Sequence, residues 1–127
     1  MGASAARVGS TVSGVDVHLV VVPAAPPAPL PHPYAGSVTS GASTVLVEGA
    51  AFATVGSPTA LDTPHLPAPP GTAFVVPPSG QGTVALGSAT VLVKGKPAAR
   101  VGDTVTTCSE VPTPATVVSG ATTVVVG

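Results

Sequence analysis

A repeat that is divided between the two ends of the chain constrains the fold more than any other feature. Residues 40–59 (SGASTVLVEGAAFATVGSPT) and 86–105 (LGSATVLVKGKPAARVGDTV) align at a shift of 46 residues. The N-terminal segment 5–11 (AARVGST) matches only the second half of this unit, and the C-terminal segment 119–127 (SGATTVVVG) matches only the first half. A linear array begins and ends with whole units, so the two halves are expected to meet as a third copy and to close the chain on itself.

Each copy has the pattern of a β-hairpin. A strand of the type Gly-Ala/Ser-x-Thr-Val-x-Val is followed by a glycine turn and a second strand of the type Ala-Ala-Arg-Val-Gly. No window of 11 residues keeps a helical period free of proline, glycine and β-branched runs, so no helix is expected. With 127 residues and 44% hydrophobic content, the sequence predicts one all-β domain over 1–127, pseudo-threefold and closed between its termini.

The repeat halves fall at 5–18, 40–65, 86–108 and 119–127, and two proline-rich insertions separate them. These insertions span 23–36 (PAAPPAPLPHPYAG) and 64–82 (PHLPAPPGTAFVVPPSGQG). Because proline fixes φ and lowers the entropy of the unfolded chain, both are expected to be ordered, extended surface loops without regular structure.

Charge excludes one class of function and favours another. Only 7% of the residues are charged and the formal net charge is −1, so the chain cannot neutralise a run of phosphates and nucleic-acid binding is not expected. So low a charge indicates a surface that another protein covers. The longest apolar stretch, 19–31, is too short and too rich in proline to span a membrane, and the N-terminus lacks the pattern of a signal peptide.

Three residues of types that commonly bind metals stand at similar places in the three repeats. His18 and His65 each lie nine residues after the glycine that ends a repeat half, and Cys108 lies six residues after the third such glycine. Equivalent positions of a closed threefold fold converge on its axis, so these three side chains are expected to meet near one point.

The remaining histidine, His32, could fill a fourth position. A His₃Cys set suits tetrahedral Zn²⁺, and four protein ligands make a closed structural site, so we expect one structural zinc ion per chain held by His18, His32, His65 and Cys108. Asp62 aligns with Cys108 at the 46-residue shift and could compete with His65. His65 is preferred because it shares its offset with His18.

Two other interpretations use the same residues differently. In the first, the chain is a metal-free repetitive structural or adhesive protein, for which alanine, valine, glycine and proline would suffice. In the second, Cys108 is the nucleophile of a small enzyme with a histidine base, which would also need an orienting group, an oxyanion site and a cleft. A linear adhesin does not explain the divided repeat, and a small valine-rich hairpin domain offers no obvious cleft.

Residues 95–103 (GKPAARVGD), with the flanking strand 87–95 (GSATVLVKG), resemble the PAAR (proline-alanine-alanine-arginine) repeat family. The N-terminal AARVG is similar, whereas the middle copy departs from the pattern, with Ala51 and Thr54 in place of the proline and the arginine. The resemblance implies a sharp β cone with zinc near its apex, held by three histidines and one cysteine.

The resemblance also implies a function. Members of this family cap the trimeric VgrG-type spike of contractile injection machines: type VI secretion systems, related phage tails and extracellular phage-tail-like particles. The chain is therefore expected to be a structural protein without enzymatic activity, a monomer by itself that binds one spike trimer and contacts the target membrane only while piercing it. It would be made in the bacterial cytoplasm and leave the cell as part of the particle.

Overall fold

The computed structural model describes residues 2–127, and every regular element in that range is a β-strand. The strands are β1 (Ala3–Ser4), β2 (Thr11–Val21), β3 (Ala28–Val38), β4 (Ala42–Val47), β5 (Ala50–Phe52), β6 (Pro58–Leu61), β7 (Ala73–Phe74), β8 (Gln81–Val84), β9 (Leu92–Val93), β10 (Lys96–Pro97), β11 (Thr104–Thr106), β12 (Ala115–Val117) and β13 (Val125–Val126). Over these residues the structure has no helix capable of crossing a membrane.

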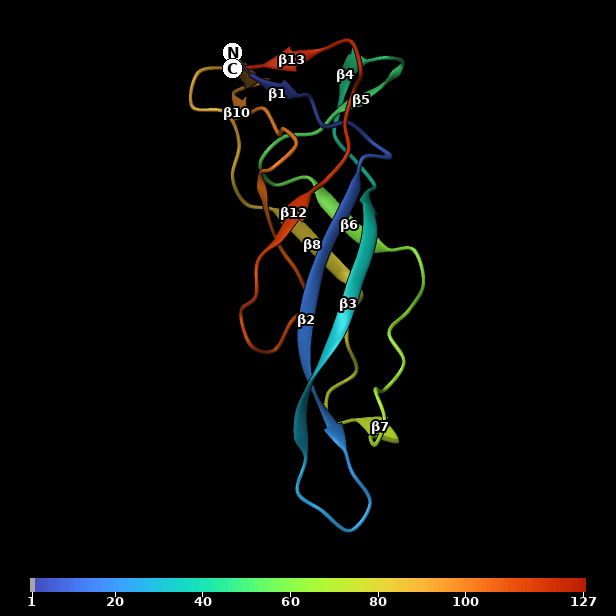
Figure 1. Cartoon of the computed structure of the whole chain (residues 1–127). Helices are drawn as coiled ribbons and strands as arrows, with labels where there is room; N and C mark the ends of the chain where they lie inside the picture. Colours follow the sequence, from blue (N-terminus) through green and yellow to red (C-terminus); the bar gives the residue numbers. More distant parts are fainter. Residues whose placement is uncertain (1) are drawn as a thin grey trace.

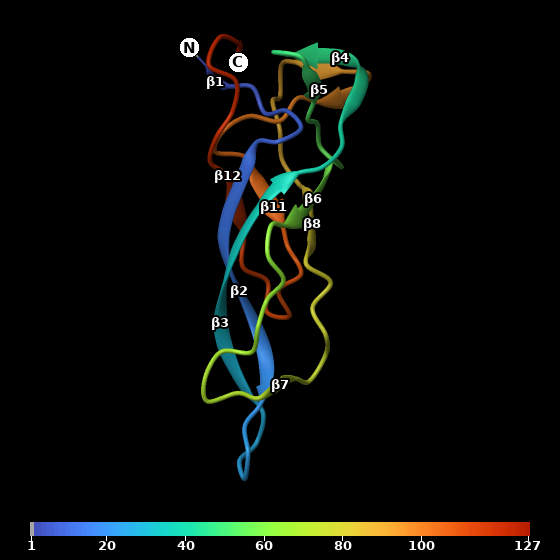
Figure 2. The same ribbon diagram turned by 90° about the vertical axis from the view of Figure 1, so that its right-hand side faces the viewer.

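Six of the strands form a closed sheet in the middle of the molecule (Figures 1 and 2). Their order is β12-β11-β8-β6-β3-β2, and β12 also pairs with β2, which closes the ring. All neighbours are antiparallel, and β7 attaches outside the ring to the end of β2. The all-β prediction is therefore confirmed.

The divided repeat also meets as expected. At the broad end of the molecule β1 pairs with β13, with Ala3 opposite Val126 and Ser4 opposite Val125, and both chain ends lie there (Figure 1). This pair stands beside two complete hairpins, β4–β5 and β9–β10. The two ends of the chain thus supply the third copy.

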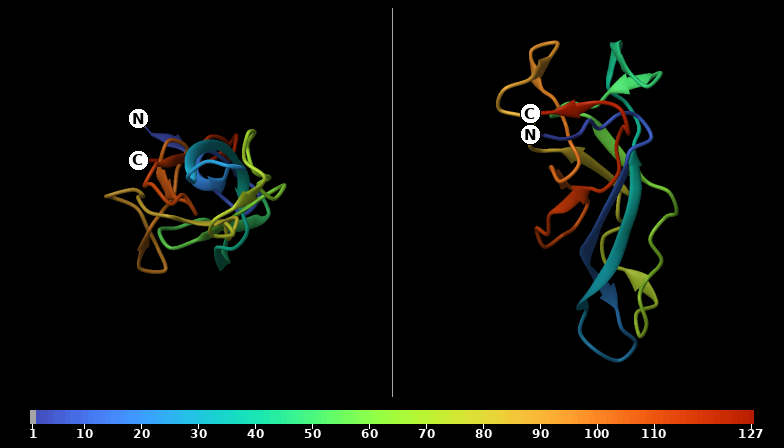
Figure 3. Two further views of the ribbon diagram at one scale, coloured as in Figure 1. Left: turned by 90° about the horizontal axis from the view of Figure 1, so that it is seen from below. Right: turned by 45° about the horizontal axis from the view of Figure 1, so that its top comes forward.

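Three backbone hydrogen bonds between equivalent residues of the three copies form a ring and follow the pseudo-threefold symmetry. The N–H of Ala6 donates to the carbonyl of Ala99 at 2.9 Å, that of Ala99 to Ala53 at 2.9 Å, and that of Ala53 to Ala6 at 3.0 Å. All three alanines are fully buried, which explains why so small a side chain stands at each position. Viewed from the narrow end, the strands are arranged around a common centre (Figure 3).

The glycine that ends each repeat half makes the same turn in all three copies. Gly9, Gly56 and Gly102 have φ of 94°, 93° and 94°, a range that other residues rarely adopt. Each donates its N–H to the carbonyl of a core valine, at 2.9, 2.9 and 2.8 Å respectively. These turns direct the chain from the broad end into the closed sheet.

The first proline-rich insertion is more regular than expected, because residues 28–36 belong to β3 and pair with β2. Pro29, Pro31 and Pro33 alternate with inward-facing Leu30, His32 and Tyr34. The three prolines occupy alternate positions of β3, and alternate residues of a strand direct their backbone N–H groups to the same side. The prolines, which lack an N–H, therefore stand at positions where pairing with β2 requires no backbone donor. The second insertion is mostly irregular, as expected, apart from β7 and the start of β8.

The molecule tapers from the three hairpins to the turn between β2 and β3, which forms the narrow end (Figures 1 and 2). Two apolar clusters fill it, one inside the closed sheet and one under the hairpins. The first contains Ala6, Val12, Tyr34, Val38, Ala53, Val84, Ala99, Val105, Ala115 and Val117, and the second Ala5, Val47, Phe52, Val93, Ala98, Ala121 and Val126. Small side chains therefore build a thin core.

A buried hydroxyl pair inside this core gives a first prediction. The Tyr34 hydroxyl lies 2.9 Å from the Thr59 Oγ1, and both residues are buried. Tyr34→Phe is expected to lower the free energy of unfolding by about 1–2 kcal/mol, because it leaves the Thr59 hydroxyl unpaired. Thr59→Val should cause a similar loss, and the double variant should lose less than the sum of the two in urea titrations. Strict additivity would show that the two hydroxyls do not interact.

Candidate metal centre

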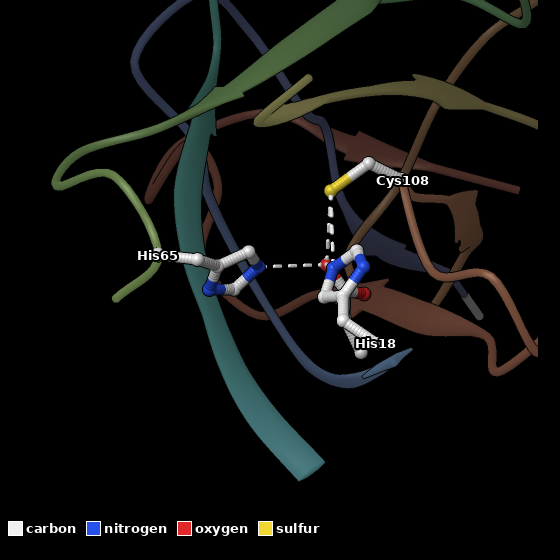
Figure 4. A group of neighbouring side chains, drawn as sticks. His18, His65 and Cys108 are labelled. Atoms are coloured by element: carbon white, nitrogen blue, oxygen red, sulfur yellow. Dashed lines mark hydrogen bonds and ion pairs between the residues drawn. The ribbon is translucent and has the colours of Figure 1, made fainter. Parts of the chain in front are cut away.

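Three of the sequence-predicted ligands, His18, His65 and Cys108, lie close together (Figure 4). His18 projects from β2, while His65 and Cys108 lie in the segments that follow β6 and β11. The Cys108 Sγ lies 3.7 Å from the His18 Nε2, and the rings of His18 and His65 are 5.1 Å apart. Each of these residues thus follows a turn of the threefold array, as the spacing predicts.

A residue that the sequence reasoning missed, Asp16, stands among them. It lies two positions before His18 on β2, so the period of two places both side chains on the same face of the strand. The Asp16 Oδ2 is 3.0 Å from the His65 Nε2, 3.2 Å from the Cys108 Sγ and 3.7 Å from the His18 Nε2. One ligand atom from each of Asp16, His18, His65 and Cys108 lies within 4.8 Å of the other three.

Neighbouring polar groups hold this cluster in place. The other carboxylate oxygen of Asp16, Oδ1, accepts a hydrogen bond from the Thr107 hydroxyl. The second ring nitrogen of His18, Nδ1, is buried without a hydrogen bond and lies 3.6 Å from the Glu110 Oε1. A carboxylate behind the second ring nitrogen is the usual support of a histidine that binds a metal through its first.

His32 packs against His18 and His65. Its ring is 5.5 Å from that of His18 and 5.6 Å from that of His65, close to the 5.1 Å between those two rings. Its Nδ1 is 2.9 Å from the Leu30 carbonyl, and its Nε2 accepts a hydrogen bond from the Ala68 N–H at 3.1 Å. Burial lowers the pKa of His32, which favours the neutral ring. Ligation by His32 stays a prediction, and Asp62 is exposed, with its carboxylate at the Ser37 hydroxyl.

The donor atoms of the cluster are of kinds that could hold a metal ion. Imidazole nitrogen, thiolate sulfur and carboxylate oxygen together can hold a divalent ion in tetrahedral geometry. Burial raises the pKa of the Cys108 thiol, and its hydrogen bond to Asp16 raises it further. A catalytic cysteine needs the opposite shift, toward the thiolate.

The fold and the cluster together define a class of protein: a closed, pseudo-threefold β cone with a buried Asp/His/His/Cys group capable of binding a metal. A family model described as the PAAR motif matches residues 76–127, and this match supports the resemblance to the PAAR-repeat family. No curated protein matches the chain.

The matched segment holds Cys108 and the complete Pro97-Ala98-Ala99-Arg100 signature, but none of the three histidines. The PAAR motif suggests a structural role as a spike tip of a contractile injection system.

Proposed function

We propose that this protein is the structural tip of a contractile injection machine, a metal-braced cone that caps a trimeric VgrG-like spike and pierces the target envelope. The observation that carries the proposal is the threefold equivalence of its broad end, where one chain presents the same structure three times. Cargo transport and catalysis are not needed to explain this surface.

The broad end presents three equivalent apolar side chains to solvent. Leu46, Leu92 and Val125 occupy the same place in the three copies, on β4, β9 and β13, and are 62%, 62% and 64% exposed. The residue after each of them, Val47, Val93 and Val126, is buried. Because side chains alternate along a strand, the three strands pack one face inward and turn the other outward.

A spike with true threefold symmetry repeats one surface three times around its axis. A single chain matches such a surface only if it carries three similar faces, which the three hairpins supply. Exposed leucine and valine side chains and free strand edges are the groups that such contact would cover. The scarcity of charge, 7% of residues, fits a surface that another protein buries.

A zinc ion would stiffen the cone where its core is thin. His18, His65 and Cys108 would hold it from three separate segments, and a fourth ligand would complete the set. The ion would supply positive charge that fixes these segments against each other, worth on the order of 10 kcal/mol in small zinc folds. The tip would then be made in the bacterial cytoplasm, leave with the particle and touch the target membrane only during piercing.

The test is assembly with the trimeric spike protein from the same source. The purified chain and the spike are mixed, and the mass of the complex is measured in solution. A complex of one chain with three spike chains supports the proposal. Absence of association between the folded chain and a folded spike trimer contradicts it.

Charged substitutions at two of the three exposed positions should weaken this complex. Burying a leucine side chain contributes about 1.5–3 kcal/mol, so Leu46→Asp with Leu92→Asp is expected to weaken binding by about 100-fold or more. Leu66→Asp is the matched control, since Leu66 is 79% exposed but lies in the second insertion. Titration with labelled spike measures the affinities of the native chain, the double variant and the control. Equal weakening by the control would show that the exposed side chains of the hairpins do not contact the spike.

A further inference from the structure

We infer that one of the three junctions between neighbouring hairpins, the one between β4–β5 and β9–β10, is a carboxylate-binding pocket. It takes an acidic side chain of the partner protein that covers the broad end, so the inference rests on the proposed function. The pocket has a volume of about 320 Å³. Its polar side chains are those of Ser40, Ser43, Thr54, Ser57, Lys94 and Lys96.

An arginine stands at the equivalent place of the other two junctions. Arg7, Thr54 and Arg100 each lie two residues before the turn glycine of their copy. The Arg7 Nε reaches to 3.8 Å from the Glu48 Oε1, and the Arg100 Nη1 donates to the Gly127 carbonyl at 3.1 Å. Both arginines thus extend to the turn position of the next hairpin. Threonine is much shorter than arginine, so this space stays open at the second junction, where Thr54 lines the pocket.

The second junction also carries positive charge without an acidic partner. At the first junction Arg7 pairs with Glu48, and at the third the Arg100 Nη2 lies 3.0 Å from the Asp103 Oδ1. The two lysines that line the pocket are exposed and form no ion pair among residues 2–127. Two of the three junctions are therefore balanced internally, and the pocket is left cationic.

The first junction shows how such a site receives a carboxylate. The Glu48 Oε2 accepts hydrogen bonds from the Thr122 hydroxyl at 3.2 Å and from the Thr123 N–H at 2.8 Å. Ser43 holds the place of Thr122 at the second junction, but the turn residue that faces it there is Lys94 instead of a glutamate. The first junction thus contains its own carboxylate, whereas at the second a carboxylate can come only from another molecule.

The surroundings of the pocket favour a protein as the source of this carboxylate. Its volume is at the lower end of the range for small-ligand pockets, about 300–1,000 Å³, and it has room for one side chain. Buried Thr54 and Ser57 line it, while Leu46 and Leu92 of the same two hairpins are exposed. A partner that covers these leucines would also shield the pocket from water, which strengthens an ion pair inside it.

The three junctions should therefore respond differently to a threefold spike. Such a spike presents the same acidic side chain three times, but Glu48 would repel it at the first junction. At the third junction Arg100 is already paired with Asp103. One spike chain in three is expected to place its acidic side chain in the pocket.

Cross-linking of the complex with a water-soluble carbodiimide tests this. The reagent joins a lysine amine to a neighbouring carboxylate as an amide and takes up the released water as a urea. Lys94 and Lys96 are the two lysines of the chain. The expected product is one tip joined to one spike chain, with an Asp or Glu of the spike linked to either lysine in the mass spectrum. A complex that forms without such a link would overturn the inference and leave the proposed function in place. Absence of any complex would overturn both.

Variants of the pocket give a second readout. Thr54→Arg with Lys94→Glu copies the Arg7–Glu48 pair into the second junction, and it should fold but bind the spike about 10-fold or more weaker. Lys94→Glu with Lys96→Glu, which alters exposed side chains alone, should weaken binding at least as much. Lys94→Arg with Lys96→Arg is the matched control: it should keep most of the affinity, because guanidinium also pairs with carboxylates, and lose the cross-link. Native affinity in both glutamate variants would show that no carboxylate enters the pocket.

Discussion

Cys108→Ala is expected to abolish zinc binding and to lower the free energy of unfolding by about 5 kcal/mol or more, which is comparable with the whole stability of many domains. The sulfur is the single soft donor in the cluster, and it joins the segment after β11 to β2 and to the segment that carries His65. Without it, Asp16 and the two histidines would be left in the interior without the metal. Zinc content and thermal unfolding of the two purified proteins measure the effect.

The metal-free native protein is the matched control for this substitution. If Cys108 stabilises the fold through zinc, chelation should bring the native chain to within about 1–2 kcal/mol of Cys108→Ala, the remainder being the lost packing of the side chain. The native thiol should also resist a thiol reagent until the metal is removed, because a buried, metal-bound thiolate is shielded. Equal stability of the native chain with and without chelator would contradict a structural metal.

The architecture could be predicted from the sequence because the repeat and its division encode topology directly. Three copies of one hairpin, with the third shared between the termini, leave few arrangements other than closure. Where the three backbones approach closely in the hydrogen-bonded ring, only small side chains fit, and Ala6, Ala53 and Ala99 meet this requirement. These are local patterns that the chain repeats, so they survive the loss of proline and arginine in the middle copy.

The fourth member of the cluster could not be predicted in the same way. The spacing of the histidines and the cysteine gives no sign of Asp16, which becomes a candidate only once β2 is known to be a strand whose alternate residues face inward. Similarly, the sequence predicts a loop around His32, whereas β3 pairs with β2 there and places His32 directly opposite Asp16. Cross-strand register arises from tertiary pairing and cannot be derived from the spacing of ligands.

Gly36→Ala is expected to open the closed sheet. A methyl group at Gly36 would lie 2.2 Å from the Ala60 carbonyl oxygen and 2.9 Å from its carbonyl carbon, at the point where β3 pairs with β6. These are backbone atoms, so no side chain can turn aside to make room. The two strands would have to separate at one of the six joints of the ring, and we expect a loss of about 3 kcal/mol or more in the free energy of unfolding.

Ser37→Ala provides the control in the neighbouring position of the same strand. Its hydroxyl makes an exposed hydrogen bond of 3.4 Å to Asp62, so removing it should change the free energy of unfolding by less than about 0.5 kcal/mol. Denaturant titrations measure both variants, and hydrogen exchange of the β6 amides should accelerate in Gly36→Ala alone. A Gly36→Ala protein as stable as Ser37→Ala would mean that β3 and β6 tolerate separation and that closure contributes little to the stability of the cone.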